Sequence, residues 1–298
     1  MDTVSITPRD FYITGDRNMT HQIYTATGCA RCRITKRYMQ ENDISYEEFD
    51  FKADGREAFS QFYRSHRKEI FRDKDGVEFP VFTDGRAICQ GLSVIVGYLI
   101  GGGDLSGFIG RSALHGEWID GFDISGGHPD HTDKFLRVLT FLKQNSLKIQ
   151  VTTDGRNASV LEAVYDKKLA DRVLMEVRGT AAFYEPLVGV AIDDDELKQS
   201  VALTARFEDY RFSTTIAPVA REDGTLAYLA PEVVGDTAKL IEEATGSKKH
   251  PYQLKAFDPQ KATDEKLKSI EPLPPGAMFK YRTSARRYMV MAEIQKST

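Results

Sequence analysis

Two cysteines separated by two residues have the clearest chemical potential in this chain. Cys29 and Cys32 stand in a C-x-x-C run that follows a short apolar segment and opens a basic helix, a pattern typical of a redox dithiol. A free cysteine has a pKa of about 8.5, which a helix N-terminus and nearby cations lower. Arg31, Arg33 and Lys36 supply such cations. We therefore predict that Cys29 is a nucleophile and Cys32 its resolving thiol.

The same spacing admits two other interpretations. A C-x-x-C pair also binds soft metals or part of an iron–sulfur cluster, and two cysteines can lie on one helix by chance. Cys89 is the third and last cysteine of the chain, and we predict that it is a buried strand thiol. So few cysteines in a long chain argue against a disulfide scaffold and favour a reducing compartment.

Composition narrows the class of protein. The chain has 298 residues, 41% hydrophobic and 28% charged, as in soluble globular proteins. A net charge of −4 gives no support to nucleic-acid binding. The longest apolar stretch, 92–100, is far shorter than the roughly 20 residues that span a bilayer. Residues 1–10 lack the apolar core of a signal peptide. We expect a cytoplasmic protein with neither a nucleic-acid nor a membrane partner.

The elements around the dithiol follow from local patterns. Alternating or short apolar runs predict strands, and helical spacing predicts helices. Strands are expected at 21–26, 45–51, 79–82 and 87–89, and helices at 29–40, 54–70 and 92–100. Pro80 begins the third strand, where a proline is often cis. We expect Pro80 to abut the dithiol and to shape a substrate groove beside it.

A glycine-rich stretch, 101–107, predicts a linker between two domains. Beyond it, strands alternate with helices, which implies a parallel sheet with right-handed crossovers. Strands are expected at 119–124, 147–152, 172–177, 210–218 and 252–257, helices at 132–145, 160–168, 196–208 and 231–245, and a last strand within 277–294. Because a closed barrel needs about 250 residues, we predict an incomplete, open α/β barrel. The expected divisions are an arm (1–20), a first domain (21–103), a linker (104–116) and a second domain (117–298).

Residues 21 to about 100 resemble a glutaredoxin. The matching runs are Ile23-Tyr24-Thr25, the C-x-x-C pair, Phe79-Pro80-Val81-Phe82-Thr83-Asp84-Gly85 and Gln90-Gly91. The resemblance implies a thioredoxin-like fold and thiol–disulfide exchange. It also implies substrate contacts from Arg31, Pro80 and Gly91. Glutathione or a disulfide-bearing protein would then be the partner.

Residues 117 to about 260 resemble the radical S-adenosylmethionine activating enzymes, which install glycyl radicals. The matching runs follow three successive predicted strands: Ile124-Ser125-Gly126-Gly127-His128-Pro129, Val151-Thr152-Thr153-Asp154-Gly155 and Leu174-Met175-Glu176-Val177-Arg178-Gly179. The resemblance implies that S-adenosylmethionine is bound there and that an anaerobic radical enzyme is the partner. The implied cofactor contacts are Gly126, Gly127, Thr153, Glu176 and Arg178.

This second segment lacks the cluster motif of that family. No C-x-x-x-C-x-x-C precedes Gly126, and no cysteine follows Cys89. An iron–sulfur cluster is therefore not expected, and no residue is assigned to a metal. The leading prediction is a glutaredoxin-like thiol–disulfide oxidoreductase whose appended barrel recognises a ligand or partner. One alternative is a protein that binds S-adenosylmethionine or a nucleotide and senses redox state through the dithiol. A weaker one is an active radical enzyme with an atypical iron–sulfur site.

Overall fold

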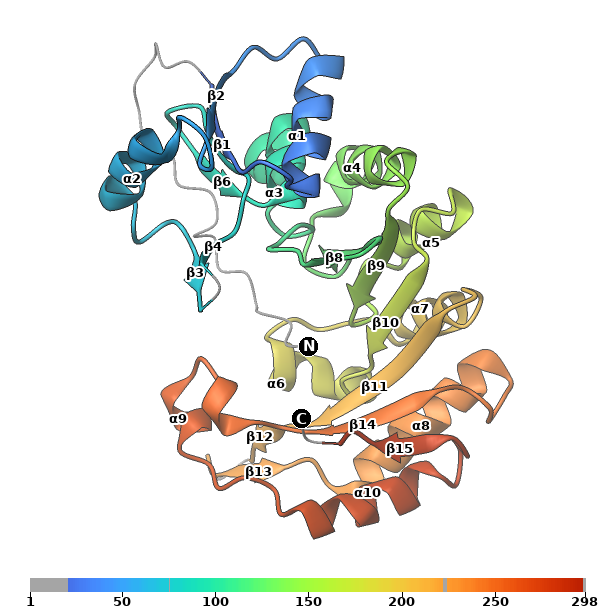
Figure 1. Ribbon diagram of the computed structural model, residues 1–298. Helices are drawn as coiled ribbons and strands as arrows, with labels where there is room; N and C mark the ends of the chain where they lie inside the picture. Colours follow the sequence, from blue (N-terminus) through green and yellow to red (C-terminus); the bar gives the residue numbers. More distant parts are fainter. Residues whose placement is uncertain (1–20, 75, 222–223, 297–298) are drawn as a thin grey trace. The chain divides into compact units, whose positions relative to one another are not determined.

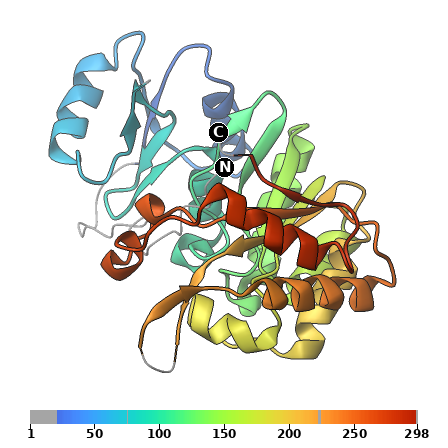
Figure 2. The ribbon, with the colours of Figure 1, turned by 90° about the horizontal axis from the view of Figure 1, so that it is seen from below.

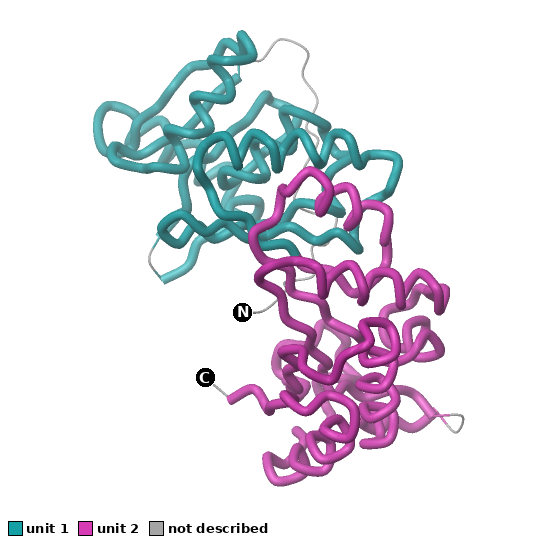
Figure 3. Tube along the Cα trace, turned by 90° about the vertical axis from the view of Figure 1, so that its right-hand side faces the viewer, with its two compact units in different colours: residues 1–151 teal, residues 152–298 magenta. Residues whose placement is uncertain are grey.

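A computed structural model describes residues 21–74, 76–221 and 224–296, and it has a mixed α/β fold. The chain divides into two compact units, residues 1–151 and 152–298 (Figure 3). The division falls inside strand β9 (Lys148–Thr153), and each unit is described separately below. The domain limits expected from the glycine-rich stretch stay a prediction.

The first unit begins with a four-stranded sheet that carries the dithiol. Its order is β2 (Glu47–Asp50), β1 (Gln22–Thr25), β5 (Val81–Thr83), β6 (Ile88–Gln90). β1 is parallel to β2 and antiparallel to β5, and β5 is antiparallel to β6. Apolar residues set this register, because Val81 and Ile23 are fully buried.

Three helices accompany this sheet: α1 (Ala30–Glu41), α2 (Arg56–Ser65) and α3 (Leu92–Gly101). α1 buries one face, which includes Ile34, Tyr38 and Met39. α3 carries no charged residue and is buried along most of its length, so it is a core helix. A short hairpin, β3 (Arg72–Asp73) with β4 (Gly76–Val77), precedes β5 and was not expected from the sequence.

The predicted linker is packed chain in the structure. It begins in a 3-10 helix, η2 (Gly102–Leu105), and Leu105, Phe108 and Ile109 are buried. The Phe108 ring stacks on Phe135 with 4.5 Å between ring centroids. The rest of the first unit consists of β7 (Leu114–His115), β8 (Trp118–Asp123), η3 (Pro129–His131), α4 (Thr132–Gln144) and part of β9.

The second unit contains the parallel sheet that the alternation of strands and helices predicts. β10 (Arg172–Glu176), β11 (Tyr210–Ile216), β14 (Tyr252–Ala256) and β15 (Ala292–Ile294) lie side by side in that order, and every pair is parallel (Figure 1). Parallel strands need crossover connections. The longer ones are supplied by α5 (Ala158–Asp166), α6 (Tyr184–Val188), α7 (Asp194–Thr204) and α8 (Pro231–Thr245).

The C-terminal segment differs from the strand predicted over 277–294. It forms the helix α10 (Met278–Ala285) before the short β15, because Met278, Tyr281 and Ala285 are buried in the core of this unit. Figures 1 and 2 both show α10 beside α8. Several smaller elements were also not predicted. They are the hairpin of β12 (Pro218–Ala220) and β13 (Leu226–Tyr228), the helix α9 (Glu265–Lys268), and the 3-10 turns η4 (Ala181–Phe183), η5 (Pro259–Lys261) and η6 (Pro275–Ala277).

Within the described ranges, none of the helices has the length and apolar character needed to cross a membrane. The cytoplasmic location stays a prediction.

Candidate functional site

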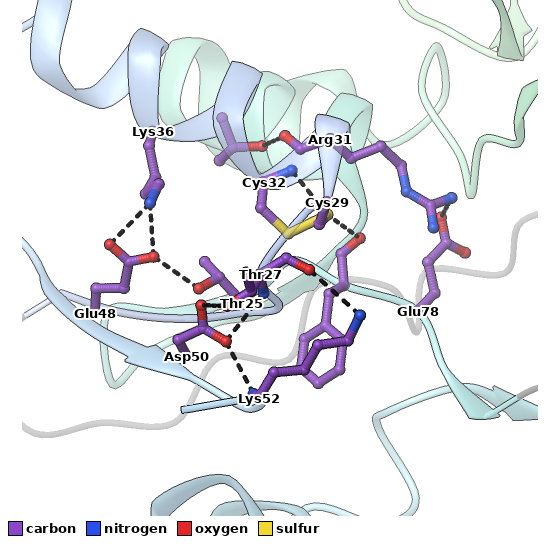
Figure 4. The surroundings of a disulfide bond; sticks show 12 residues. Thr25, Thr27, Cys29, Arg31, Cys32, Lys36, Glu48, Asp50, Lys52 and Glu78 are labelled. Carbon is purple, nitrogen blue, oxygen red and sulfur yellow. Dashed lines mark hydrogen bonds and ion pairs between the residues drawn. A yellow bond between two sulfur atoms is a disulfide. The ribbon is translucent and has the colours of Figure 1, made fainter. Parts of the chain in front are cut away.

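The structure joins Cys29 and Cys32 in a disulfide at the N-terminus of α1 (Figure 4). Cys29 is the N-cap residue, and its Sγ accepts a hydrogen bond from the Cys32 N–H at 3.1 Å. Cys29 is half-buried, whereas Cys32 is 2% exposed. The expected placement of the pair at the start of a helix is therefore correct, and Cys29 is its more accessible sulfur.

The residues predicted to bind a substrate lie around this disulfide. The Phe79–Pro80 peptide bond is cis, and Phe79 O lies 3.8 Å from Cys29 Sγ. Pro80 O accepts a hydrogen bond from the Gly91 N–H at 2.9 Å. Gly91 has φ +88°, a backbone conformation that favours glycine, at the start of α3. Pro80 thus follows a residue whose carbonyl oxygen lies near the dithiol, and the role of Pro80 and Gly91 in substrate binding stays a prediction.

Arg31 has a partner that the sequence did not suggest. Its Nη1 lies 2.6 Å from Glu78 Oε1, and both side chains are largely buried. Burial raises the pKa of Glu78, against the opposing effect of the Arg31 charge. Lys36 is likewise paired, with Glu48 at 2.7 Å (Figure 4). Two of the three cations that were expected to favour a thiolate, Arg31 and Lys36, therefore have a carboxylate beside them.

Cys89 is the remaining cysteine, and it is fully buried on β6. Burial raises the pKa of its thiol. Its predicted status as a buried strand thiol is confirmed.

Gly126 and Gly127 lie in the first unit and are closely packed. An added Cβ on Gly126 would lie closer than 3.0 Å to the backbone of Gly107, and one on Gly127 closer than 3.0 Å to the Phe108 ring. These approaches explain why both positions are glycine without any ligand. Their predicted contact with a cofactor stays a prediction.

The second unit holds a polar cluster at the carboxyl ends of its strands. Glu176 ends β10, and its Oε1 accepts hydrogen bonds from Arg178 Nη1 at 3.0 Å and from Thr215 Oγ1 at 2.5 Å. The Glu176 side chain is 16% exposed and that of Arg178 is 32% exposed. Arg178 Nε is buried and has no hydrogen-bond partner. The two predicted residues are thus brought together, and Thr215 from β11 was missed.

The strand-end turn after β9 connects to this cluster. Thr153 Oγ1 accepts a hydrogen bond from the Gly155 N–H at 3.0 Å, and Asp154 pairs with Arg156 at 2.7 Å. The Tyr184 hydroxyl donates to Asp154 O at 2.5 Å and accepts from the Arg178 N–H at 3.4 Å. Burial raises the pKa of Tyr184, so it remains a neutral donor.

Chemically, this strand-end cluster can hold a ligand with both acceptor and hydroxyl groups. The buried Arg178 N–H lacks an acceptor, and a ligand carboxylate or hydroxyl oxygen would supply one. Glu176 can accept from a hydroxyl or an ammonium group. S-adenosylmethionine carries all of these groups, so the residues present fit it. Tyr184 and Asp154 were missed as members, although the Asp154-Gly155 turn signal was visible in the sequence.

The residues do not fit an iron–sulfur cluster in the same way. In the ranges that the structure describes, no three or more histidine, cysteine, aspartate or glutamate side chains gather where they could hold a metal. Cys29 and Cys32 are bonded to each other, and Cys89 is buried. We therefore derive no chemical step through a cluster.

Comparison with curated proteins identifies one relevant relative. The chain is 24% identical over 158 residues to the Methanocaldococcus jannaschii protein named "Putative glycyl-radical enzyme activating enzyme". The match covers 53% of this chain and 62% of the relative, so the chain spans less than two thirds of that protein's length. No protein-family model matches the chain.

Solved structures give weaker similarity. A domain of the pyruvate-formate lyase-activating enzyme from Bacteroides vulgatus aligns with 14% identity and a TM-score of 0.40, over 58% of this chain and 98% of that one. Coproporphyrinogen III oxidase from Escherichia coli, a radical SAM enzyme, aligns with 14% identity and a TM-score of 0.39, over 57% and 41%.

The sequence relative corrects three predictions. The leading prediction, a glutaredoxin-like thiol–disulfide oxidoreductase, is wrong, because the match is to a glycyl-radical enzyme activating enzyme. The predicted enzyme class, thiol–disulfide oxidoreductase, is wrong for the same reason. The similarity also contradicts the expectation that no iron–sulfur cluster is involved, although the described residues do not themselves gather a set of ligands for one. The chain is thus similar, over about half of its length, to a protein named as a putative glycyl-radical enzyme activating enzyme.

Proposed function

We propose that this chain is a radical S-adenosylmethionine activating-enzyme-like protein whose second unit binds S-adenosylmethionine at the carboxyl ends of β10 and β11. The observation that carries the proposal is Arg178, whose buried Nε has no hydrogen-bond partner while Nη1 is held by Glu176. A guanidinium fixed on one side and unsatisfied on the other is arranged to receive an acceptor from a ligand.

The neighbouring residues support the same role. Tyr184 ties Asp154 to the Arg178 backbone, and Thr215 ties Glu176 to β11. These hydrogen bonds fix the orientation of the charged pair before a ligand arrives, which lowers the entropy cost of binding. Arg178 would hold the ligand carboxylate, and Glu176 would accept from a ribose hydroxyl. When bound, S-adenosylmethionine would supply a cleavable sulfonium.

The partner is proposed on the same basis. The relative is named as an activating enzyme for a glycyl-radical enzyme. By that similarity, an anaerobic glycyl-radical enzyme is the protein on which this chain acts. Thr153, which lies in the second unit, is kept as a proposed cofactor contact.

For the first unit, the proposal concerns fold alone. The sheet order β2–β1–β5–β6, with α1 opening at the C-x-x-C pair and Pro80 before β5, supports a thioredoxin-like arrangement of residues 21–103. No activity of the dithiol is included in the proposal.

The test is an anaerobic calorimetric titration with S-adenosylmethionine. A hydrogen bond to a charged group contributes roughly 1.5–3 kcal/mol. We therefore expect saturable binding to the unmodified chain and binding at least about tenfold weaker in Arg178→Gln. The matched control is Arg172→Gln, because Arg172 is 37% exposed and pairs with Asp209 at the other end of β10. No binding to the unmodified chain, or equal loss in both variants, would refute the proposal.

A second readout concerns the cluster. Iron and sulfide are measured after anaerobic reconstitution of the unmodified chain and of a Cys29→Ser, Cys32→Ser variant. Stoichiometric iron and sulfide that the variant loses would assign the pair as ligands. Equal iron in both would exclude the pair from that role.

A further inference from the structure

An exposed basic patch lies at the other end of the second unit's sheet, where its strands begin. It combines four cationic and two aliphatic side chains, all exposed in the structure: Lys248, Lys249, Arg286, Arg287, Val290 and Met291. They come from the loop between α8 and β14 and from the chain between α10 and β15. Val290 is 48% exposed and Met291 is 52% exposed, so the apolar members are as open as ordinary surface residues.

Backbone contacts hold the two segments of the basic patch together. The Val290 N–H donates to Lys248 O at 3.1 Å, and Lys248 Nζ donates to Arg287 O at 3.3 Å. Arg286 Nε donates to Ala292 O at 3.0 Å, which anchors its stem and leaves its terminal nitrogens for other acceptors. The two segments that carry the basic patch are therefore held together.

Its charge is poorly compensated. From Met278 to Met291 the sequence contains four cations and no carboxylate, in a chain whose net charge is −4. Among the residues that the structure describes, Glu242 is 3.4 Å from Lys248, and no ion pair joins a carboxylate to Lys249, Arg286 or Arg287. A local excess of positive charge on an acidic protein favours an anionic partner at this position.

We propose that the basic patch is a docking surface for a partner protein that presents an acidic segment with interleaved aliphatic side chains. Carboxylates would pair with the arginines, for which bidentate geometry is available. The aliphatic side chains of the partner would cover Val290 and Met291, and removing this apolar surface from water would favour binding. A contact centred on six side chains is smaller than the roughly 20–30 residues a side of a stable interface, so we expect it to be transient.

Other anionic partners fit less well. Nucleic acid lacks aliphatic groups that would cover Val290 and Met291, and these two side chains have no flat face on which a base could stack. Membrane binding through an amphipathic helix requires an exposed apolar face. α10 instead buries Met278, Tyr281 and Ala285 in the core.

The position of the basic patch separates it from the proposed ligand site. Lys248 and Lys249 precede β14, and Met291 precedes β15. Glu176, in contrast, is the last residue of β10, and Arg178 follows it. In a parallel sheet these positions lie at opposite ends of the strands, the amino ends and the carboxyl ends. A partner docked here leaves the ligand edge open, and the inference does not depend on which ligand that edge binds.

The test uses a fluorescein-labelled synthetic peptide in which pairs of glutamate and leucine alternate, followed by fluorescence anisotropy with the full chain. We expect saturable binding that weakens as salt rises, because exposed charges are screened. The variant Arg286→Glu with Arg287→Glu should bind at least about tenfold more weakly. The matched control, Lys266→Glu with Lys268→Glu, changes the net charge equally at exposed positions on α9 and should bind within about twofold.

A third variant, Val290→Ser with Met291→Ser, should also weaken binding while keeping the salt dependence. Equal loss in the basic-patch and control variants would overturn the proposal. Tighter binding of single-stranded DNA or phosphatidylserine vesicles than of the peptide would overturn it in favour of those partners. Self-association of the chain at low salt that Arg286→Glu abolishes would instead assign the basic patch to a second copy. Circular dichroism of each variant confirms that it is folded.

Discussion

Replacing Gly127 by alanine tests whether this glycine is required by packing or by a ligand. The added Cβ would lie closer than 3.0 Å to several atoms of the Phe108 ring. That ring is fully buried and stacks on Phe135 with an interplanar angle of 10°, so it cannot rotate away without disturbing a second aromatic ring. Overpacking of this kind costs about 1–3 kcal/mol.

The assay is urea unfolding followed by circular dichroism, together with the thermal midpoint. For a unit of this size each kcal/mol corresponds to roughly 2–4 °C. We expect Gly127→Ala to lower the midpoint by several degrees and a Phe108→Ala background to remove most of that increment. The matched control is Gly103→Ala, where an added Cβ meets nothing within 4 Å. A Gly127→Ala variant as stable as the unmodified chain would refute the packing argument.

Three further predictions concern buried or capping groups. Burial lowers the pKa of His250 below its ordinary 6.5, so the unfolded chain binds a proton more readily than the folded chain. The free energy of unfolding should therefore fall as the pH drops below about 6.5. In unfolding titrations, His250→Gln should flatten that pH dependence. Glu196 accepts hydrogen bonds from the Asn157 and Ala158 N–H groups at the start of α5. In urea unfolding, Glu196→Ala should therefore lower the free energy of unfolding by about 1–2 kcal/mol. An unchanged midpoint would show that Glu196 does not stabilise the start of the helix. Cys89 should resist iodoacetamide in the folded, reduced chain while Cys29 reacts, as read by mass spectrometry; rapid labelling of Cys89 would show that it is accessible.

Local sequence patterns predicted most of the helices and strands, because the apolar residues of each pattern are the ones that the tertiary structure buries. The amphipathic run behind α4 buries Phe135, Leu136 and Leu139 as expected, and the alternation of strands and helices produces parallel pairing in the second unit. The C-terminal helix α10 was missed because its apolar residues contact α8, a long-range effect that no local window contains. Leu105 and Phe108 follow the glycines of the expected linker and are buried, which glycine density alone does not indicate.

The candidate site was partly visible in the same way. Glu176 and Arg178 were identified from a strand-end run, but their partners Thr215 and Tyr184 come from other elements with no motif around them. Around the disulfide, the pairing of Arg31 with Glu78 depends on a residue distant in sequence, in the connection between β4 and β5. The function predicted from the C-x-x-C pair was wrong, because this local spacing occurs in redox and metal-binding sites alike and does not by itself determine a function.

Hydrogen–deuterium exchange with and without S-adenosylmethionine tests the central claim most directly, because it reports where the ligand acts. The account predicts slower exchange of the backbone amides at 176–184 and 213–216 on addition of S-adenosylmethionine, with those at 247–252 unchanged. Exchange that is unaffected by S-adenosylmethionine, or slowed only at 247–252, would contradict a ligand site at the carboxyl ends of β10 and β11.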